Sequence, residues 1–441
     1  MPSLMDIGKS AINAQRQALN VTGQNIANVN TDGYRRRDAD LKEVSGSQSE
    51  LASKSAQIGL GVSLGEVRRA FNSYLAQSAN SAESKFQSAS NFVNSLERLE
   101  NLILPNEGDL SSQLTNFFGK ISDISANPGD LAPRAAALEQ GSGLANSFNV
   151  TAQVITELKG QLRQSIDEEV NALNRLTESL ATVNSRLRAS NIGSAPPNAL
   201  LDERDRLVAQ ISKKALVTVE YGSRSEANLS FGRFVEGPSL ISGDKAIPVN
   251  VTHSDLSGSI FQLGDGISFK SIDDGSIRGL TDSLTIIQST LEKLDNLAVR
   301  VVEELNAMHI NGIDYDGEKG KELFTAKQFT IDQPQTNSKE LDVTLLQVPG
   351  KIDAMQEMQV IYSAATDEWT AKAADGTIVG KGRQEIDLDG MVLKVNSRAK
   401  NGDMFSVSRV RGEASRIDFL LLNGREFAAA SNFVITPSST N

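Results

Sequence analysis

The sequence of 441 residues has no cysteine, only two histidines and a single tryptophan, Trp369. Without cysteine there is no disulfide and no thiolate chemistry, so the chain must gain its stability from packing or from assembly. Aromatic residues make up only 5% of the chain, which favours polar-faced helices and assembly surfaces over a deep ligand pocket. No stretch of about 18 apolar residues exists, so the sequence predicts no membrane-spanning helix.

Basic residues are in the minority: 44 Lys and Arg stand against 55 Asp and Glu, a formal charge of −11. Non-specific nucleic-acid binding needs clustered Lys and Arg, and the run Arg35-Arg36-Arg37 is too short to reverse this balance. The first residues, MPSLMDIGKS, lack the basic start, apolar block and small-residue cleavage site of a secretory signal. We expect a chain that stays in the cytoplasm or leaves by a route that reads no cleavable signal.

The first 28 residues carry apolar side chains in three seven-residue series. The series are Met5, Ile12, Leu19 and Ile26; Leu4, Ala11 and Ala18; and Ile7, Ala14 and Val21. This spacing is typical of an amphipathic helix, with a stripe wider than one small helix buries alone. We expect it to need a partner from its own chain or from a neighbouring subunit. The polar segment Thr31-Asp32-Gly33-Tyr34 ends the helix, and Gly33 is expected to adopt a positive φ.

Helical and β-rich segments alternate along the rest of the chain. Helices are expected at about 69–104, 110–126, 133–188, 200–211 and 280–309, with a short strand near 62–67. In the longest helix, a seam of apolar residues three and four apart runs from Ile155 to Leu187. Alternating β-branched residues predict β structure at about 216–270 and 329–410.

This order predicts an α+β multidomain protein, in which two β-rich domains are inserted into a long α-helical bundle or coiled-coil body. The expected parts are an N-terminal amphipathic assembly helix, disordered in the monomer (1–40), the first part of the helical body (41–214), a small inserted β domain (215–274), the return helix of the body (275–324), a second inserted β domain (325–412) and an incomplete, truncated return to the body (413–441).

Residues that could carry catalysis are few. Neither His253 nor His309 neighbours a patterned nucleophile, so no catalytic residue is predicted. The segment Asp314-Tyr315-Asp316-Gly317 lacks the third ligand and the closing glutamate of a calcium loop, so a turn is expected. Asp202, Arg204 and Asp205 fit interhelical salt bridges, or a cap near the end of the long helix, better than a catalytic carboxylate pair. We therefore predict no enzyme, no cofactor and no metal site.

The segment Ala27-Asn28-Val29-Asn30-Thr31-Asp32-Gly33-Tyr34 resembles the N-terminal signature of the flagellar axial proteins, which comprise the rod, hook and hook-associated families. Five further stretches resemble, in order, the FlgK family of hook–filament junction proteins: Gly59–Val62, Val67–Leu75, Leu200–Leu207, Leu305–Asp314 and Gly402–Val407. Hook and rod chains turn to β structure soon after the signature and lack a helical body of this extent. The C-terminal helical region of the family has no visible counterpart here.

The resemblance implies a structural subunit of the bacterial flagellum at the junction between hook and filament. Such a subunit is extracellular, exported unfolded by the flagellar type III system without a cleavable signal, and assembled through its terminal helices. Its implied partners are hook protein, the second hook–filament junction protein, copies of itself in a helical tube, and an export chaperone that binds a C-terminal segment missing here. No nucleic acid and no membrane insertion are expected.

We assign the assembly interface to eight residues, which are Leu4, Ile7, Ile12, Leu19, Ile26, Asn28, Gly33 and Tyr34. Two alternatives remain open at this point. One is a flagellar hook or rod protein. The other, from a different class, is a secreted adhesin or a cell-wall-acting enzyme that uses the β insertions.

Overall fold

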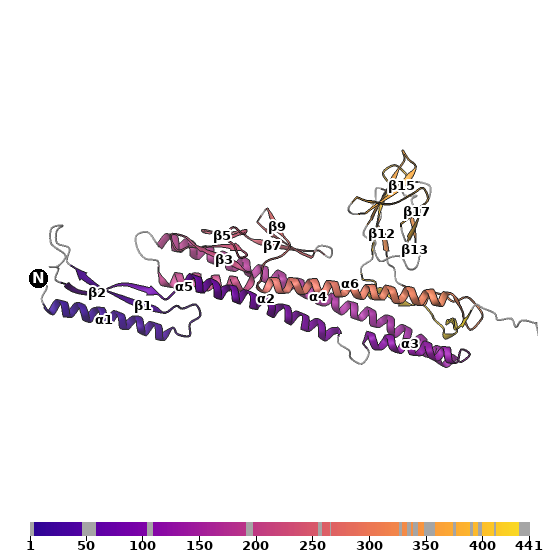
Figure 1. Ribbon diagram of the computed structural model, residues 1–441, viewed down its shortest axis with the longest axis horizontal. Coiled ribbons are helices and arrows are strands. Elements are labelled where there is room, and N and C mark those ends of the chain that lie inside the picture. Colours follow the sequence, from indigo (N-terminus) through magenta and orange to yellow (C-terminus); the bar gives the residue numbers. More distant parts are fainter. Residues whose placement is uncertain are drawn as a thin grey trace, which may run out of the picture. The chain divides into compact units, whose positions relative to one another are not determined.

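The computed structural model describes residues 4–45, 59–103, 109–190, 197–254, 258–264, 266–325, 329–332, 337, 343–347, 358–373, 376–388, 391–395, 399–409 and 412–431. The chain divides into two compact units. The first unit combines Met1–Leu96 with Leu162–Thr285, and the second combines Glu97–Gln161 with Ile286–Asn441. Each unit has helices and β structure of its own (Figure 1).

The α-helices of the described ranges are α1 (Leu4–Ala27), α2 (Ser73–Ile103), α3 (Leu110–Ala126), α4 (Leu131–Ser190), α5 (Asn198–Lys214) and α6 (Gly275–Ile310). Their limits lie close to those expected from the apolar periodicity. The largest differences are at two helix starts: α6 begins at Gly275 rather than at about 280, and α2 begins at Ser73 rather than at about 69, because Arg69 belongs to a strand. Helix α3 begins where Asp109 accepts a hydrogen bond from the backbone N–H of Ser112 at 2.8 Å.

The apolar seam of α4 is buried as its spacing predicts. Ile155, Leu158, Leu162, Ile166, Val170, Leu173, Leu180, Val183 and Leu187 are all buried, and Leu176 is half-buried. Burying a Leu or Ile side chain stabilises a fold by about 1.5–3 kcal/mol, so this seam is a major source of stability in the helical body.

A β-hairpin, which the sequence predicts only in part, follows α1. Strands β1 (Arg37–Ser45) and β2 (Gly59–Arg69) pair antiparallel from Arg37 opposite Arg69 to Ser45 opposite Gly59. The glycine-bracketed strand near 62–67 was expected, whereas β1 was not. Its sequence RDADLKEVS has charged side chains on both faces, so it carries little apolar alternation.

The small β domain of the first unit consists of two antiparallel sheets. One has the order β3-β4-β5-β6 and the other β7-β8-β9. Their strands are β3 (Val217–Tyr221), β4 (Ala227–Phe231), β5 (Ser239–Ser242), β6 (Lys245–Ala246), β7 (Val249–Ser254), β8 (Gly258–Leu263) and β9 (Ile267–Phe269). Phe231, Phe261 and Phe269 pack their rings together between the sheets.

Polar side chains of α4 attach this β domain to the helix. The amide of Asn184 accepts from the backbone N–H of Ala227 at 2.9 Å and donates to the Gly243 carbonyl at 2.6 Å. Asn174 makes a matching pair of bonds to the N–H and carbonyl of Val249, at 2.9 and 2.8 Å. Because Asn184 is fully buried, these bonds satisfy backbone groups that water cannot reach.

The second β domain lies in the second unit and has its own core. Its sheets have the orders β12-β19-β14-β15-β16 and β13-β18-β17. The strands are β12 (Phe329–Asp332), β13 (Val343–Gln347), β14 (Met358–Ser363), β15 (Glu368–Ala373), β16 (Ile378–Gly382), β17 (Glu385–Asp387), β18 (Met391–Val395) and β19 (Met404–Arg409). Trp369, 1% exposed, packs against Phe405 and Tyr362 at centroid distances of 5.2 Å.

Residues 413–431 return to the second unit without an α-helix. They form two 3₁₀ turns, Ala414–Arg416 and Gly424–Glu426, and two short strands, β20 (Asp418–Phe419) and β21 (Ala430–Ser431). These strands pair with β11 (Phe324–Thr325) and β10 (Gly312–Ile313). The rest of the expected return, residues 432–441, lies outside the described residues. The α+β multidomain fold class is confirmed.

Candidate assembly surface

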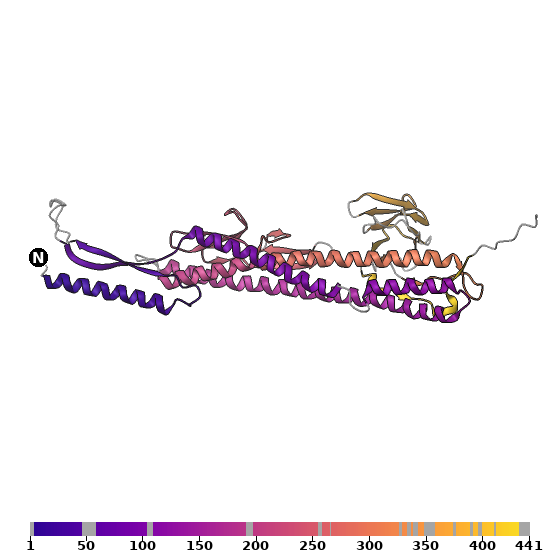
Figure 2. The same ribbon diagram turned by 60° about the horizontal axis from the view of Figure 1, so that its bottom comes forward.

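Helix α1 has one face against the hairpin. Its axis follows β1 and β2 (Figures 1 and 2). Ala14 and Val21 are buried on this face and Ile7 is half-buried. These three residues form the third seven-residue series of the sequence, so the partner of this series is a hairpin of the same chain rather than a second helix.

A close contact fixes how the helix lies on the hairpin. Ser10 donates to the Ile7 carbonyl at 2.8 Å and accepts from the backbone N–H of Val62 at 3.2 Å. Opposite it, Gly61 has φ +114°, and a Cβ at this position would lie 2.2 Å from Ser10 Oγ. The position therefore requires glycine for both its backbone conformation and its space.

The other face of α1 is uncovered. Leu4, Met5, Ile12, Leu19 and Ile26, which we call the α1 stripe, are 64% to 90% exposed. Val29, at 75%, extends the apolar surface beyond the helix end. Contiguous exposed apolar side chains of this size mark interaction sites. Four of the eight residues assigned to the interface, Leu4, Ile12, Leu19 and Ile26, belong to this stripe.

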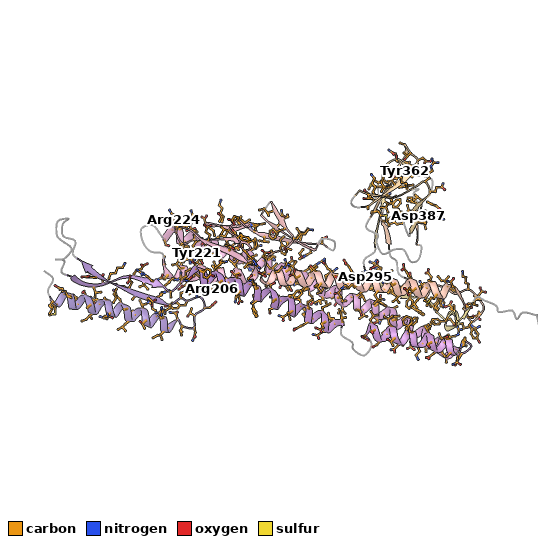
Figure 3. The ribbon with its side chains drawn as sticks, in the orientation of Figure 1. Arg206, Tyr221, Arg224, Asp295, Tyr362 and Asp387 are labelled. Carbon is orange, nitrogen blue, oxygen red and sulfur yellow. The ribbon has the colours of Figure 1, made fainter. Side chains whose placement is uncertain are left out.

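Asn28, Gly33 and Tyr34, also assigned to the interface, lie in the turn after α1. The Asn28 side chain bonds to the Gln24 carbonyl and to the Thr31 hydroxyl, at 2.9 and 3.2 Å. Gly33 has φ +79°, which is the positive φ expected from the sequence. A Cβ added at Gly33 would also lie 2.9 Å from the Arg206 side chain of α5. Arg206 is labelled in Figure 3.

Asn25 holds this turn to the start of β1. Its side-chain oxygen accepts from both the Tyr34 hydroxyl and the Arg37 N–H at 2.9 Å, and its amide donates to the Arg37 carbonyl at 2.7 Å. The Arg37 guanidinium then lies 4.9 Å from the centre of the Tyr34 ring. Tyr34 therefore shapes the connection between α1 and the hairpin rather than the exposed surface.

Charged side chains anchor the hairpin to α5. Arg37 is 3.1 Å from Asp202, and Arg69 is 2.8 Å from the other carboxylate oxygen of Asp202. Arg69 also pairs with Asp205, which in turn accepts from Arg204 at 2.5 Å. We call these five residues the neck cluster. The side chains of Arg69, Arg204 and Asp205 are each only 5% exposed.

Aromatic rings cover one side of the neck cluster. The Arg204 guanidinium lies 4.3 Å from the centre of the Tyr221 ring, and Phe71 meets the same ring edge-on at 5.9 Å. Tyr221 is labelled in Figure 3. Burial, followed by the charge of Asp205, raises the pKa of Tyr221. Its hydroxyl therefore stays neutral beside the carboxylates.

The neck cluster corrects the role expected for Asp202, Arg204 and Asp205. They were assigned to salt bridges between helices or to a cap near the end of the long helix. Instead, the two carboxylates bind arginines of a hairpin that the sequence reveals only in part. A buried pair of this kind adds little net stability by itself, but removing one partner is costly because it strands a buried charge.

The histidines occupy structural positions. His253 joins the cross-strand Ser259 at 2.9 Å through Nδ1 and Asp167 of α4 at 3.2 Å through Nε2. Ser259 is only 4% exposed, which leaves its hydroxyl without access for a substrate.

The expected turn at Asp314–Gly317 is present, since Asp314 accepts from the N–H groups of Asp316 and Glu318, both at 2.9 Å.

Within the described ranges, no three His, Cys, Asp or Glu side chains gather in a way that could hold a metal ion. Across the same residues, no helix is long and apolar enough to span a bilayer.

Three features of the surface were not assigned from the sequence. Met5 belongs to the α1 stripe and follows from the same heptad spacing. The arginine–aspartate pairing could not be read from the sequence, because its partners are far apart in the chain. Asn25 bonds to the nearby Tyr34 and Arg37, but through a turn whose geometry no side-chain pattern records. Ile7 is the one assigned helical residue that faces the hairpin rather than solvent.

Comparison with known proteins gives two family matches. Residues 96–324, about half of the chain, match the helical domain of flagellar hook-associated protein FlgK. Residues 5–35 match the flagella basal body rod protein family. The second match covers α1 and the turn after it, the segment whose signature is shared by axial proteins.

Individual relatives agree with the match to the FlgK family. Flagellar hook-associated protein 1 of Salmonella typhimurium is 26% identical over 99% of this chain and 80% of its own length. The Bacillus subtilis protein of the same name is 25% identical over 73% of this chain and 69% of its own length. The solved structure of the flagellar hook junction protein FlgK from Burkholderia pseudomallei has the same fold, with a TM-score of 0.59 and 22% identity. That likeness covers 80% of this chain and 66% of the Burkholderia chain, just under two thirds.

Proposed function

Because the chain belongs to the family of flagellar hook-associated protein FlgK, we infer that it is a structural subunit of the bacterial flagellum, at the junction between hook and filament. The family is structural rather than enzymatic. The observation that carries the role of this chain is the α1 stripe, an apolar helix face left uncovered on a module that the neck cluster attaches to the body.

The stripe supplies the driving force for assembly. Each Leu, Ile or Met side chain that a neighbour covers contributes about 1.5–3 kcal/mol. This gain offsets the loss of freedom on association, which takes several kcal/mol. Contacts of this kind between identical subunits are head-to-tail and do not close, so they generate a helical tube.

Helix α1 completes its ordering during assembly. Only Ala14 and Val21 of its 24 residues are buried by the hairpin, and a lone helix of that length is marginal in water. The proposal that this segment is disordered in the free monomer rests on that small contact. Neighbouring subunits then cover the stripe and repay the cost of ordering.

The partners are part of the proposal. They are hook protein on one side, the second hook–filament junction protein on the other, and further copies of this chain in the tube. We propose further that the subunit is exported unfolded by the flagellar type III system, without a cleavable signal, to the cell exterior. An export chaperone would bind a C-terminal segment.

Electron microscopy of cells lacking the gene, with an assay for flagellin in the medium, tests the role. Complete hooks without filaments, together with shed flagellin, are the expected result. Absent hooks would assign the chain to the hook or rod instead, and normal motile filaments would remove the structural role. The comparisons favour neither the hook or rod alternative nor a secreted adhesin or cell-wall enzyme.

A further inference from the structure

His309 lies in the last turn of α6, where the C-terminal segment passes over it. The residue is 7% exposed. Its Nδ1 is 2.5 Å from the Lys321 carbonyl oxygen, and its Nε2 is 2.8 Å from the backbone nitrogen of Ala428. The Phe427 ring stands edge-on to the imidazole at 6.0 Å. The side chain therefore joins α6, the 314–321 loop and the C-terminal segment.

The two backbone partners fix the protonation state of the ring. A backbone N–H can only donate, so Nε2 must present a lone pair to Ala428. A carbonyl can only accept, so the single proton of the neutral ring is on Nδ1. A second proton on Nε2 would place one N–H against another and destroy the bond to Ala428. Protonation and this contact are therefore mutually exclusive.

We propose that His309 is an acid-sensitive latch, which holds residues 428–431 against the end of α6 and releases them when its ring is protonated. The released segment comprises the run Ala428–Ala430 and the end of β21. It forms one wall of a groove of about 540 Å³, whose other walls include Phe118, Leu305 and Met308. Release would open this apolar groove.

Other charged residues near His309 hold the chain on the N-terminal side of Ala428, so protonation of His309 would release only the residues that follow. In the loop, Asp316 pairs with Arg425 and Lys321 pairs with Glu426 at 2.8 Å. Asp314 uses its carboxylate on backbone N–H groups of its own turn. The residues of α3 that line the groove, Phe118, Ile121, Ile124 and Ser125, are uncharged. From α4, Arg134 donates to the Phe427 carbonyl at 2.7 Å and tethers the segment when the latch is open.

The direction of the pH dependence follows from burial. Burial lowers the pKa of His309, against weaker opposing effects of the Lys321 carbonyl and of Asp314. The folded chain therefore takes up the proton at a lower pH than the unfolded chain does. The stability that the neutral ring contributes is complete above the ordinary histidine pKa of about 6.5 and is lost as the pH falls below it.

Hydrogen exchange read by mass spectrometry on a peptide covering 424–431 tests the latch. Exchange protection, corrected for the intrinsic effect of pH, should fall about tenfold between pH 7.5 and pH 5 in the wild-type chain, as loss of one buried hydrogen bond implies. In His309→Gln it should not change with pH. The matched control is His253→Gln, which removes the only other histidine and should behave as the wild type does.

Protection that is constant in the wild type, or that falls equally in His309→Gln, would overturn the proposal. If His309→Gln does not fold, the imidazole proton signals of the wild type decide, assigned by comparison with His253→Gln. A His309 midpoint below the ordinary histidine value supports the latch, and an ordinary midpoint refutes it.

Discussion

Nε of Arg69 lies 2.8 Å from Oδ1 of Asp202, where the end of the hairpin meets α5. The arginine is 5% exposed and the aspartate 11%. Both charges are thus held almost without water, and their compensation comes from each other and from one further partner each, Asp205 for Arg69 and Arg37 for Asp202. The attachment of the α1 module to the body is therefore sensitive to single substitutions.

Asp205→Asn should destabilise the first unit by about 3–5 kcal/mol, because Arg204 would keep a buried charge without its carboxylate and Arg69 would keep only Asp202. Urea unfolding of the purified chain, followed by circular dichroism, measures the change. Asp244→Asn is the control, since its pair with Arg188 is about half exposed and is worth about 0–1 kcal/mol. Equal effects of the two substitutions would show that the neck cluster is not stabilised by charge pairing.

Leu19→Asp should abolish assembly and leave the melting temperature of the monomer nearly unchanged, because Leu19 is 69% exposed and contacts no core. Complementation of a strain lacking the gene, scored by filament formation, reads the first effect, and calorimetry reads the second. Gln17→Asp adds the same charge to an exposed polar position of the helix and should permit assembly. A sharp fall in melting temperature for Leu19→Asp would mean that the stripe is packed in the monomer.

Gly61→Ala should loosen α1 from the hairpin. The substitution adds a Cβ 2.2 Å from Ser10 Oγ in a backbone conformation with φ +114°, which costs about 1–3 kcal/mol in strain alone. Filament formation should fall, because the strained contact weakens the packing of α1 on the hairpin that assembly completes. Gly8→Ala is the control: nothing lies within 4 Å of its added Cβ, and it should favour the helix by about 1 kcal/mol. Filament formation that is unchanged in Gly61→Ala would show that the contact is not needed.

Unfolding of the second β domain should be visible separately from that of the helices. Trp369 is the only tryptophan of the chain and is buried in the core of that domain, beside Phe405. Its fluorescence in a urea titration therefore reports on that core, whereas circular dichroism at 222 nm reports mainly on the helices. We expect two midpoints. A single midpoint for both signals would mean that the domain and the helices unfold together.

Much of the helical structure could be predicted because its signal is local. The seam from Ile155 to Leu187 needs only the three-and-four spacing, and the positive φ of Gly33 needs only a turn residue at a helix end. The exposed stripe of α1 follows from the same periodicity. The sequence could not say which of its apolar series faces the hairpin, since all three have the same period.

The neck cluster and strand β1 could not be predicted for the opposite reason. β1 has charges on both faces, and its stability comes from its pairing with β2 and its contact with α1. Asp202 and Asp205 are typical of a charged helix until the hairpin brings Arg37 and Arg69 to them. Such pairs depend on tertiary structure, which no local pattern records.

The contact between Ser10 and Gly61 has a geometric consequence. With no space between helix and hairpin at this point, α1 cannot roll about its own axis once it is packed. The exposed apolar side chains of α1 therefore keep one fixed orientation about the helix axis relative to the hairpin. In the tube that we propose, the same orientation in successive subunits would give every step of the helical lattice the same rotation, so one glycine would help to set the regularity of that tube.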